Sequence, residues 1–352
     1  MLAKRDNGFV SLFDEHTGLY LRTEILNNGI DTGIEAFMAS FPELLDVGIM
    51  GHCVHGLSGL CLSSGVQCYQ RGDCINDANM SLEDFRWIVE QCRGKTFQIA
   101  LGGRGDPDQH EHFTDILELC RKNTIVPNFT TSGFGMTEDL ASHCARYCGA
   151  VAVSWYRSPY TNRSIELLVR AGVKTNIHYV LMKDTLREAV ERLKERDFPK
   201  GINAVVFLLH KPVGLGKTEQ IVRYDNPLFE ELLRMVDKER FPFRIGFDSC
   251  STPALIRELR NVELSSIDAC EGARWSAYIS PDMKMLPCSF GCQTSQWEVD
   301  LRQCSIMDAW RSEKFDAFRQ AMREACPTCS LREQCMGGCH ICPEVILCAN
   351  KM

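Results

Sequence analysis

Three features that are common in proteins are missing from this chain of 352 residues. No apolar segment follows the first seven residues, which excludes a secretory signal peptide, and no apolar run approaches the ~20 residues that span a bilayer. A basic excess is also missing, since the net charge is −7, which argues against a general nucleic-acid binder. These absences predict a cytoplasmic protein that binds neither membranes nor nucleic acid.

Cysteine, by contrast, is abundant, with 19 residues. Thiols stay reduced in the cytoplasm, so clustered cysteines there are typical of metal sites rather than disulfides. The first cluster has the spacing C-x7-C-x6-C and directly follows a strand-like run at 44–50: Cys53, Cys61 and Cys68. Three thiolates on one loop suit three irons of a 4Fe–4S cluster and leave the fourth iron open. The loop alone leaves a zinc site, or a chance grouping, open as well.

Strand-like and helix-like segments alternate from residue 44 onward. Periodicity predicts further strands at 97–101, 126–130, 150–155, 174–181, 204–209 and 243–247. It predicts helices at 82–92, 113–122, 137–147, 162–171, 185–196 and 226–237. This alternation is typical of a parallel sheet with right-handed crossovers, and its length predicts an α/β fold, a partial (β/α)6 TIM-like barrel. In such barrels the chemistry lies on loops at the carboxyl ends of the strands, where the first cysteine cluster falls.

The chain divides into three parts. Residues 1–43 are expected to form a preamble with a hairpin (9–13 and 18–22), residues 44–247 the barrel, and residues 248–352 a cysteine-rich iron–sulfur extension. Within the extension we expect a hairpin between 277 and 287 and one helix at 306–324.

The extension contains a dense C-x2-C-x5-C-x3-C run: Cys326, Cys329, Cys335 and Cys339. Other cysteines lie before it (Cys250, Cys270, Cys288) and after it (Cys342, Cys348). Two glycines before Cys339 let the backbone fold tightly around ligands. A C-x2-C pair also occurs in zinc sites, but this many candidate ligands fits two closed clusters better than one zinc ion.

Together with the segment from Cys270 to Cys288, this run resembles the SPASM extension of radical S-adenosylmethionine (SAM) enzymes of the peptide-maturase type. Met283 stands where that pattern has a glycine. The resemblance implies two auxiliary 4Fe–4S clusters, and therefore three clusters with that of the first loop. The ligands implied for auxiliary cluster I are Cys250, Cys270, Cys288 and Cys339. Those implied for auxiliary cluster II are Cys326, Cys329, Cys335 and Cys348, with Cys348 preferred to Cys342 because the family usually leaves a longer gap.

The resemblance extends into the barrel. Segment 101–107, Leu-Gly-Gly-Arg-Gly-Asp-Pro, resembles the family's glycine-rich strand end that receives the SAM amino group, with Asp106 in place of the usual glutamate. Bare backbone lets a ligand approach, and a carboxylate pairs with an ammonium. The SAM contacts that the resemblance implies are Tyr69, Gly102, Gly103, Asp106, Ser132, Ser154, Arg163 and Asn176. Each of them alone also fits a cap or a turn.

The first loop departs from the family spacing, which is C-x3-C-x2-C, and Cys74 is a spare thiol close by. Cys292 and Cys304 match no part of the pattern. The remaining cysteines are expected to be small core residues: Cys92, Cys120, Cys144 and Cys148. Segment 214–218, Gly-Leu-Gly-Lys-Thr, lacks the first glycine of a phosphate loop and is expected to be the loop after the sixth strand.

The resemblance implies an enzyme that reductively cleaves SAM to a 5′-deoxyadenosyl radical and abstracts a hydrogen from a ribosomally made precursor peptide. The product would be a cross-link, a thioether, an epimer or an excised backbone. The implied partners are the precursor peptide, a flavodoxin- or ferredoxin-type electron donor, and a separate small leader-peptide-recognition protein, since residues 1–43 are shorter than a module of about 80 residues. Two alternatives stay open: a radical SAM enzyme that acts on a small molecule or on another enzyme's active site, and a non-catalytic iron–sulfur electron carrier.

Overall fold

The computed structural model describes residues 1–63, 65–293 and 295–349. Its central element is a ten-stranded sheet of order β12-β11-β10-β9-β8-β7-β6-β13-β14-β15. Seven neighbouring strands are parallel: β6 (Leu44–Met50), β7 (Gln98–Gly103), β8 (Val126–Thr131), β9 (Val151–Ser154), β10 (Thr175–Leu181), β11 (Ala204–Leu209) and β12 (Arg244–Phe247). Because they are parallel, their carboxyl ends share one edge.

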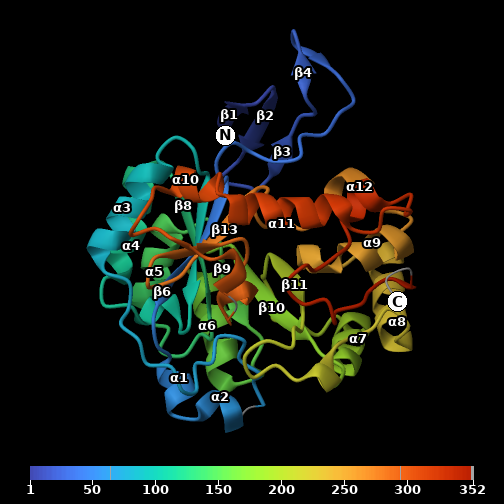
Figure 1. Cartoon of the computed structure of the whole chain (residues 1–352). Helices are drawn as coiled ribbons and strands as arrows, with labels where there is room; N and C mark the ends of the chain where they lie inside the picture. Colours follow the sequence, from blue (N-terminus) through green and yellow to red (C-terminus); the bar gives the residue numbers. More distant parts are fainter. Residues whose placement is uncertain (64, 294, 350–352) are drawn as a thin grey trace.

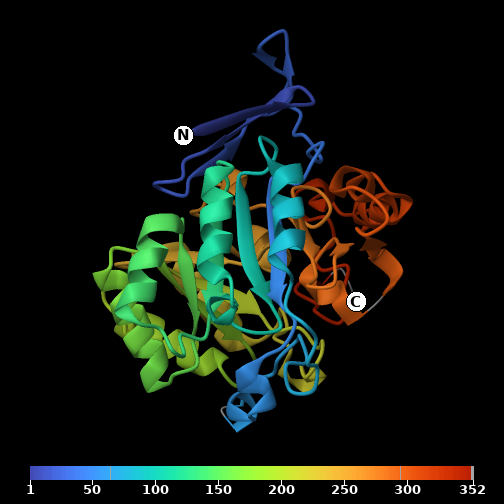
Figure 2. The ribbon, with the colours of Figure 1, turned by 90° about the vertical axis from the view of Figure 1, so that its left-hand side faces the viewer.

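Six helices join these seven strands in turn: α3 (Leu82–Cys92), α4 (Phe113–Lys122), α5 (Glu138–Tyr147), α6 (Pro159–Arg170), α7 (Leu186–Glu195) and α8 (Pro227–Lys238). They cover the outer face of the curved sheet (Figure 2). The helix α3 shows why they form: the Ser81 side chain accepts a hydrogen bond from the Asp84 N–H, and apolar side chains at helical spacing, among them Phe85 and Val89, are buried. The predicted α/β partial barrel is confirmed.

The amino-terminal strands form a separate antiparallel sheet of β1 (Leu2–Asp6), β2 (Phe9–Phe13) and β3 (Tyr20–Arg22). The predicted hairpin is the β2–β3 pair, whereas β1 and the projecting pair β4 (Leu26–Asn27) and β5 (Ile30–Asp31) were not predicted. The sheet lies at the end of the barrel opposite α1 (Val54–Leu57) and α2 (Leu60–Ser63) (Figures 1 and 2). It therefore covers the amino ends of the barrel strands.

The extension continues the barrel sheet. Strand β13 (Ser276–Ile279) pairs in parallel with β6, then antiparallel with β14 (Lys284–Leu286), which pairs with β15 (Val299–Asp300). The predicted hairpin is thus confirmed. The domain boundary near residue 247 stays a prediction, and the backbone hydrogen bonds between β6 and β13 join the parts on its two sides. In the hairpin turn, Met283 has a φ of +65°, the left-handed region that favours the glycine of the family pattern.

The prediction of one helix at 306–324 was wrong, because two helices occupy this segment: α10 (Ile306–Trp310) and α11 (Glu313–Glu324). The Ser312 side chain caps the second helix by accepting a hydrogen bond from the Phe315 N–H. Two further helices are α9 (Thr252–Glu258) and α12 (Arg332–Cys335). Short 3-10 turns are η1 (Pro107–Gln109), η2 (Thr218–Gln220), η3 (Ser249–Ser251), η4 (Leu264–Ser266), η5 (Ser289–Gln293) and η6 (Ser295–Trp297). Among the described residues, none of the helices has the length and apolar character needed to cross a membrane.

Candidate functional site

The cysteine loop begins directly after β6, at the carboxyl ends of the barrel strands. The Cys53 side chain caps α1 by accepting a hydrogen bond from the Gly56 N–H at 3.3 Å. Behind this turn, Gly56 lies so close to the Gly72 carbonyl that an added Cβ would be 2.1 Å from its oxygen. The start of the loop is therefore packed against its own continuation.

Two neighbouring segments fix the loop in place. Arg104 donates hydrogen bonds to the Gln70 carbonyl at 2.9 Å and to the Gly51 carbonyl at 2.7 Å. On the other side, the Leu215 N–H donates to the Cys68 carbonyl at 2.9 Å. Segment 214–218 is thus the loop after β11, as predicted, and it anchors the end of the cysteine loop.

The structure brings the three thiols of this loop together. Burial, followed by the charges of the neighbouring Cys53, Cys68 and Asp106, raises the pKa of the Cys61 thiol to about 12. The spare thiol Cys74 lies apart from them, exposed and 3.2 Å from Arg71 Nη2. Mutually close thiols bind metal as thiolates and release their protons when they do so.

Asp106 is held at the same edge by the next strand. Its carboxylate accepts hydrogen bonds from the Ser132 N–H at 2.8 Å and from the Ser132 hydroxyl at 2.5 Å. Gly103, with a φ of +114°, lets β7 approach the Met50 carbonyl, where an added Cβ would lie 2.6 Å from the oxygen. Gly102 has no heavy atom within 4 Å of its Cβ position, which leaves room beside the backbone.

The other predicted SAM contacts are more dispersed. Ser154 ends β9 at the same edge, and Tyr69 packs its ring 4.6 Å from that of Phe290 in the extension. Arg163 is exposed in the first half of α6. Asn176 lies near the amino end of β10, where its side-chain oxygen accepts a hydrogen bond from Asn203 at 2.7 Å. The roles of these four residues stay predictions.

Four thiols implied for auxiliary cluster I converge beside β11 and β12. The pKa of Cys250 is raised by a hydrogen bond with Cys339 and by burial. The pKa of Cys288 is raised by burial and then by the neighbouring Cys250, Cys270 and Cys339. The pKa of Cys270 is likewise raised to about 12, by burial and then by Cys250. Cys250 therefore lies with the three cysteines whose grouping was predicted from the motif.

The four thiols implied for auxiliary cluster II line one cavity, formed by Pro253, Cys326, Cys329, Arg332, Cys335, Gly337, Gly338, Val345, Leu347 and Cys348. Gly337 and Gly338 both have positive φ, +76° and +75°, so the chain turns sharply into the cavity wall. Cys342 does not line this cavity; its N–H donates instead to Cys339 Sγ at 3.2 Å. The geometry therefore favours Cys348 over Cys342.

The remaining cysteines lie outside these groups. Cys304 Sγ donates to the Asp300 carbonyl oxygen at 3.5 Å. Cys292 is half-buried beside Tyr278, and burial followed by Cys292 raises the pKa of that tyrosine. Three of the four predicted core cysteines are fully buried: Cys92, Cys120 and Cys144. Within residues 1–63, 65–293 and 295–349, no three His, Cys, Asp or Glu side chains meet the geometry for a single metal ion.

Sequence reasoning missed two residues at this edge. Tyr156, just after β9, lies close to Asp106, Cys61 and Cys68, which together with its burial raise its pKa. His178 lies inside the barrel on β10, with Nδ1 3.3 Å from Thr130 Oγ1, and burial lowers its pKa to about 4. In the sequence alone, both residues look like ordinary members of the hydrophobic core. Only the register of the strands shows that they lie at the site.

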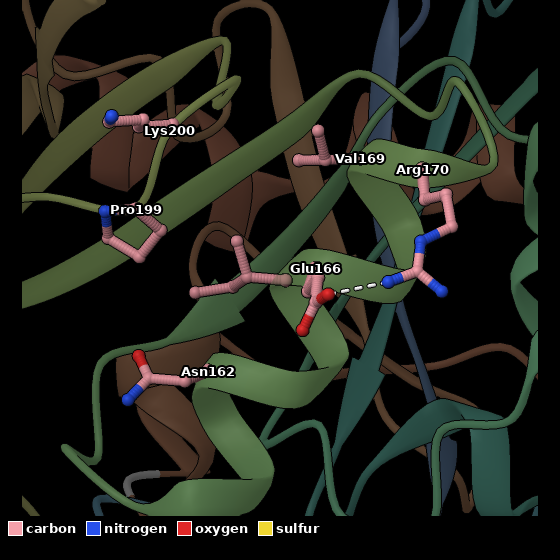
Figure 3. Close-up of a pocket in the computed structure, with 7 residues that line it drawn as sticks. Asn162, Glu166, Val169, Arg170, Pro199 and Lys200 are labelled. Carbon is pink, nitrogen blue, oxygen red and sulfur yellow. Dashed lines mark hydrogen bonds and ion pairs between the residues drawn. The ribbon is translucent and has the colours of Figure 1, made fainter.

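A shallow groove on the outer surface is separate from this edge. It is lined by Asn162, Ile165, Glu166, Val169, Arg170, Pro199 and Lys200 (Figure 3). Glu166 and Arg170 pair with each other on α6, at 2.5 Å, rather than pointing at a common centre. We assign no function to this groove.

Comparisons with known proteins find the fold but no relative by sequence. No family model and no curated protein matches this chain. SuiB of Streptococcus suis, solved bound to S-adenosylmethionine, superimposes with a TM-score of 0.66 at 16% identity, over 90% of this chain and 78% of SuiB. Bound to its precursor peptide SuiA, SuiB gives a TM-score of 0.67 at 17% identity, over 90% and 77%. Native anSMEcpe with bound AdoMet and the Cp18Cys peptide gives 0.59 at 17% identity, over 86% of this chain and 91% of that one. At these identities the likeness establishes the fold.

Proposed function

We propose that this protein is a radical SAM enzyme with a SPASM-type extension, and that it modifies a peptide. The observation that carries this proposal is the meeting of three thiols with the Asp106 carboxylate at the carboxyl ends of β6 and β7. Thiolates suit iron–sulfur chemistry, and a carboxylate suits an ammonium group. An electron carrier needs the first of these features but not the second.

The residues present fit the implied clusters. Each of the three groups consists of cysteine thiols alone, which is the donor set of iron–sulfur proteins. Cys53, Cys61 and Cys68 would hold the cluster that leaves one iron without a protein ligand. When bound, that cluster supplies an electron and a coordination position, so that SAM can be cleaved to methionine and a 5′-deoxyadenosyl radical.

The chain's own part is to bind, orient and exclude water. Asp106, fixed by Ser132, receives the amino group of SAM, while Gly102 leaves space for the ligand beside β7. His178 faces the barrel interior as a neutral ring at physiological pH, because burial lowers its pKa to about 4. Since Nδ1 contacts Thr130 Oγ1, the ring offers a substrate its Nε2 alone, without a charge.

The class of substrate is supported by the fold. SuiB was solved with its precursor peptide SuiA and anSMEcpe with a peptide, in a fold that this chain shares over most of its length. The two cysteine groups of the extension would hold auxiliary clusters I and II. We include in the proposal a flavodoxin- or ferredoxin-type electron donor and a separate small protein that recognises the leader of the precursor peptide.

This proposal is tested with reconstituted protein under anaerobic conditions. After reconstitution, iron and sulfide are counted and the protein is incubated with SAM and dithionite while 5′-deoxyadenosine is measured. We expect about twelve irons in the wild type and about eight when Cys53, Cys61 and Cys68 are all changed to alanine, because one four-iron cluster is lost. Nucleoside should form only with the wild type and with the control Cys74→Ala, which changes the exposed thiol of the same segment.

A fully loaded wild type that yields no nucleoside, with or without candidate peptides, would contradict the proposal and favour the electron carrier. Nucleoside formation that no peptide stimulates, but a small molecule does, would retain the radical SAM assignment and reject the peptide.

A further inference from the structure

The helix α1 (Val54–Leu57) lies within the seven-residue gap between Cys53 and Cys61. This single turn separates its side chains into two sets. Val54 and Leu57 point outward, with 57% and 44% of their surfaces exposed, whereas His55 is turned inward and only 6% exposed. The close packing of Gly56 on Gly72 fixes this orientation.

The inward ring of His55 is held on one side by packing. Its centroid lies 4.7 Å from that of Phe134 in an edge-to-face arrangement, and Phe134 in turn packs 5.5 Å from Tyr160. Phe134 belongs to the loop after β8, two residues beyond Ser132. The imidazole is therefore wedged between the cysteine loop and the ends of the barrel strands.

The free edge of this ring faces the candidate ammonium site. His55 Nε2 lies 3.2 Å from Asp106 Oδ2. This nitrogen is buried, and it meets no acceptor in hydrogen-bond geometry in the part of the chain that the structure describes, so its contact with Asp106 is one of ion-pair distance. Asp106 thus has its two oxygens fixed by Ser132 on one side and approached by His55 on the other.

We propose that His55 is a positioning residue, which orients the Asp106 carboxylate for the amino group of SAM, and that the lengthened first gap of the cysteine loop serves to carry it. The inference rests on the proposed function. A carboxylate has about four lone-pair positions; Ser132 takes two of them and His55 approaches a third, which leaves one for the ligand.

The test compares His55→Phe and His55→Gln with Val54→Ala, an outward position of the same turn. Phenylalanine keeps a ring against Phe134 but has no N–H, and glutamine restores an N–H donor. For each reconstituted full-length variant we would count iron and measure the equilibrium binding of SAM and of a SAM analogue that lacks the α-amino group.

We expect unchanged iron in all variants and a roughly tenfold weaker binding of SAM by His55→Phe, the effect of one hydrogen bond to a charged group. His55→Gln should recover part of that loss, and Val54→Ala should bind as the wild type does. The deaminated analogue should bind the wild type and His55→Phe equally, because the coupling runs through the amino group.

Loss of iron in His55→Phe, unchanged SAM binding, or an equal loss with the analogue would each overturn the positioning role. Those results differ from a failure of the proposed function, in which the fully loaded wild type itself would not bind SAM.

Discussion

Lys211 Nζ lies 2.6 Å from Asp248 Oδ2, and this ion pair joins the carboxyl ends of β11 and β12. The lysine side chain is 1% exposed, and its ammonium also donates to the Leu209 carbonyl at 3.0 Å. Burial lowers the pKa of this ammonium, but the charges of Asp248, Cys250 and Cys339 together outweigh burial and raise it. The pair thus connects the barrel to the thiols implied for auxiliary cluster I.

Removing the Lys211 ammonium should destabilise the folded protein. We expect Lys211→Met to reduce the free energy of unfolding by about 3–5 kcal/mol, because it leaves Asp248 charged and partly buried without its partner. The double variant Lys211→Met/Asp248→Asn should lose less than the sum of the two single changes, since the two residues interact directly. Anaerobic urea unfolding of the iron-loaded proteins measures both.

The exposed pair of Lys122 and Glu118, at 3.2 Å on α4, provides the control for that experiment. Lys122→Met should cost less than ~1 kcal/mol, as exposed pairs do. Equal losses from Lys211→Met and Lys122→Met would contradict the role of burial.

The last ligand of auxiliary cluster II can be identified by counting iron. We expect the iron content to fall from about twelve atoms per chain in the wild type to about eight in Cys348→Ala. The reason is that Cys348 lines the cavity with Cys326, Cys329 and Cys335. Cys342→Ala should keep full loading, since Cys342 is packed at 2% exposure beside Cys339. The opposite pattern of iron loss would assign the ligand to Cys342.

Asp108 should make stability depend on pH. Burial, followed by the charge of Asp106, raises its pKa to about 7 from the ordinary 3.8. A carboxyl that binds its proton more tightly when folded contributes stability below the unfolded pKa, and this contribution is lost as pH rises from 3.8 towards 7. Asp108→Asn removes the effect.

The difference in unfolding free energy, Asp108→Asn minus wild type, should therefore increase by about 1–3 kcal/mol between pH 5 and pH 8. Chemical unfolding of both proteins at several pH values measures this difference. Parallel stability curves for the two proteins across that range would rule the effect out.

The glycine that supports the cysteine loop should not tolerate a side chain. At Gly214, with a φ of +66°, an added Cβ would lie 2.4 Å from the Tyr69 carbonyl oxygen. Gly59 has a similar φ of +77° but nothing within 4 Å. Both alanine variants share the backbone strain of about 1 kcal/mol, and Gly214→Ala should lose a further ~1–3 kcal/mol through overpacking.

Unfolding measurements give these two values, and iron counts report whether the loop still loads. If Gly59→Ala is as destabilising as Gly214→Ala, the contact with Tyr69 has no energetic role.

The sequence by itself determined the barrel. Alternating apolar runs specify strands and helices because each must bury one face, and this period is visible without any structure. It also determined two cysteine-rich regions, since the spacing of Cys326, Cys329 and Cys335 is a local property of the chain. The strain at Met283 shows why the family pattern has a glycine there, and a local motif could indicate that position.

Only the tertiary structure decided which distant residues meet. Cys250 and Cys339 are far apart in sequence, and the return of the chain, not its local spacing, brings them together. The same holds for His55 and Asp106, which belong to different loops. Helical periodicity could not divide 306–324, because the cap at Ser312 depends on one hydrogen bond, and strand periodicity did not reveal that the Asn176 side chain accepts a hydrogen bond from Asn203. Burial patterns depend on the nearest few residues, whereas a site depends on the register of several strands at once.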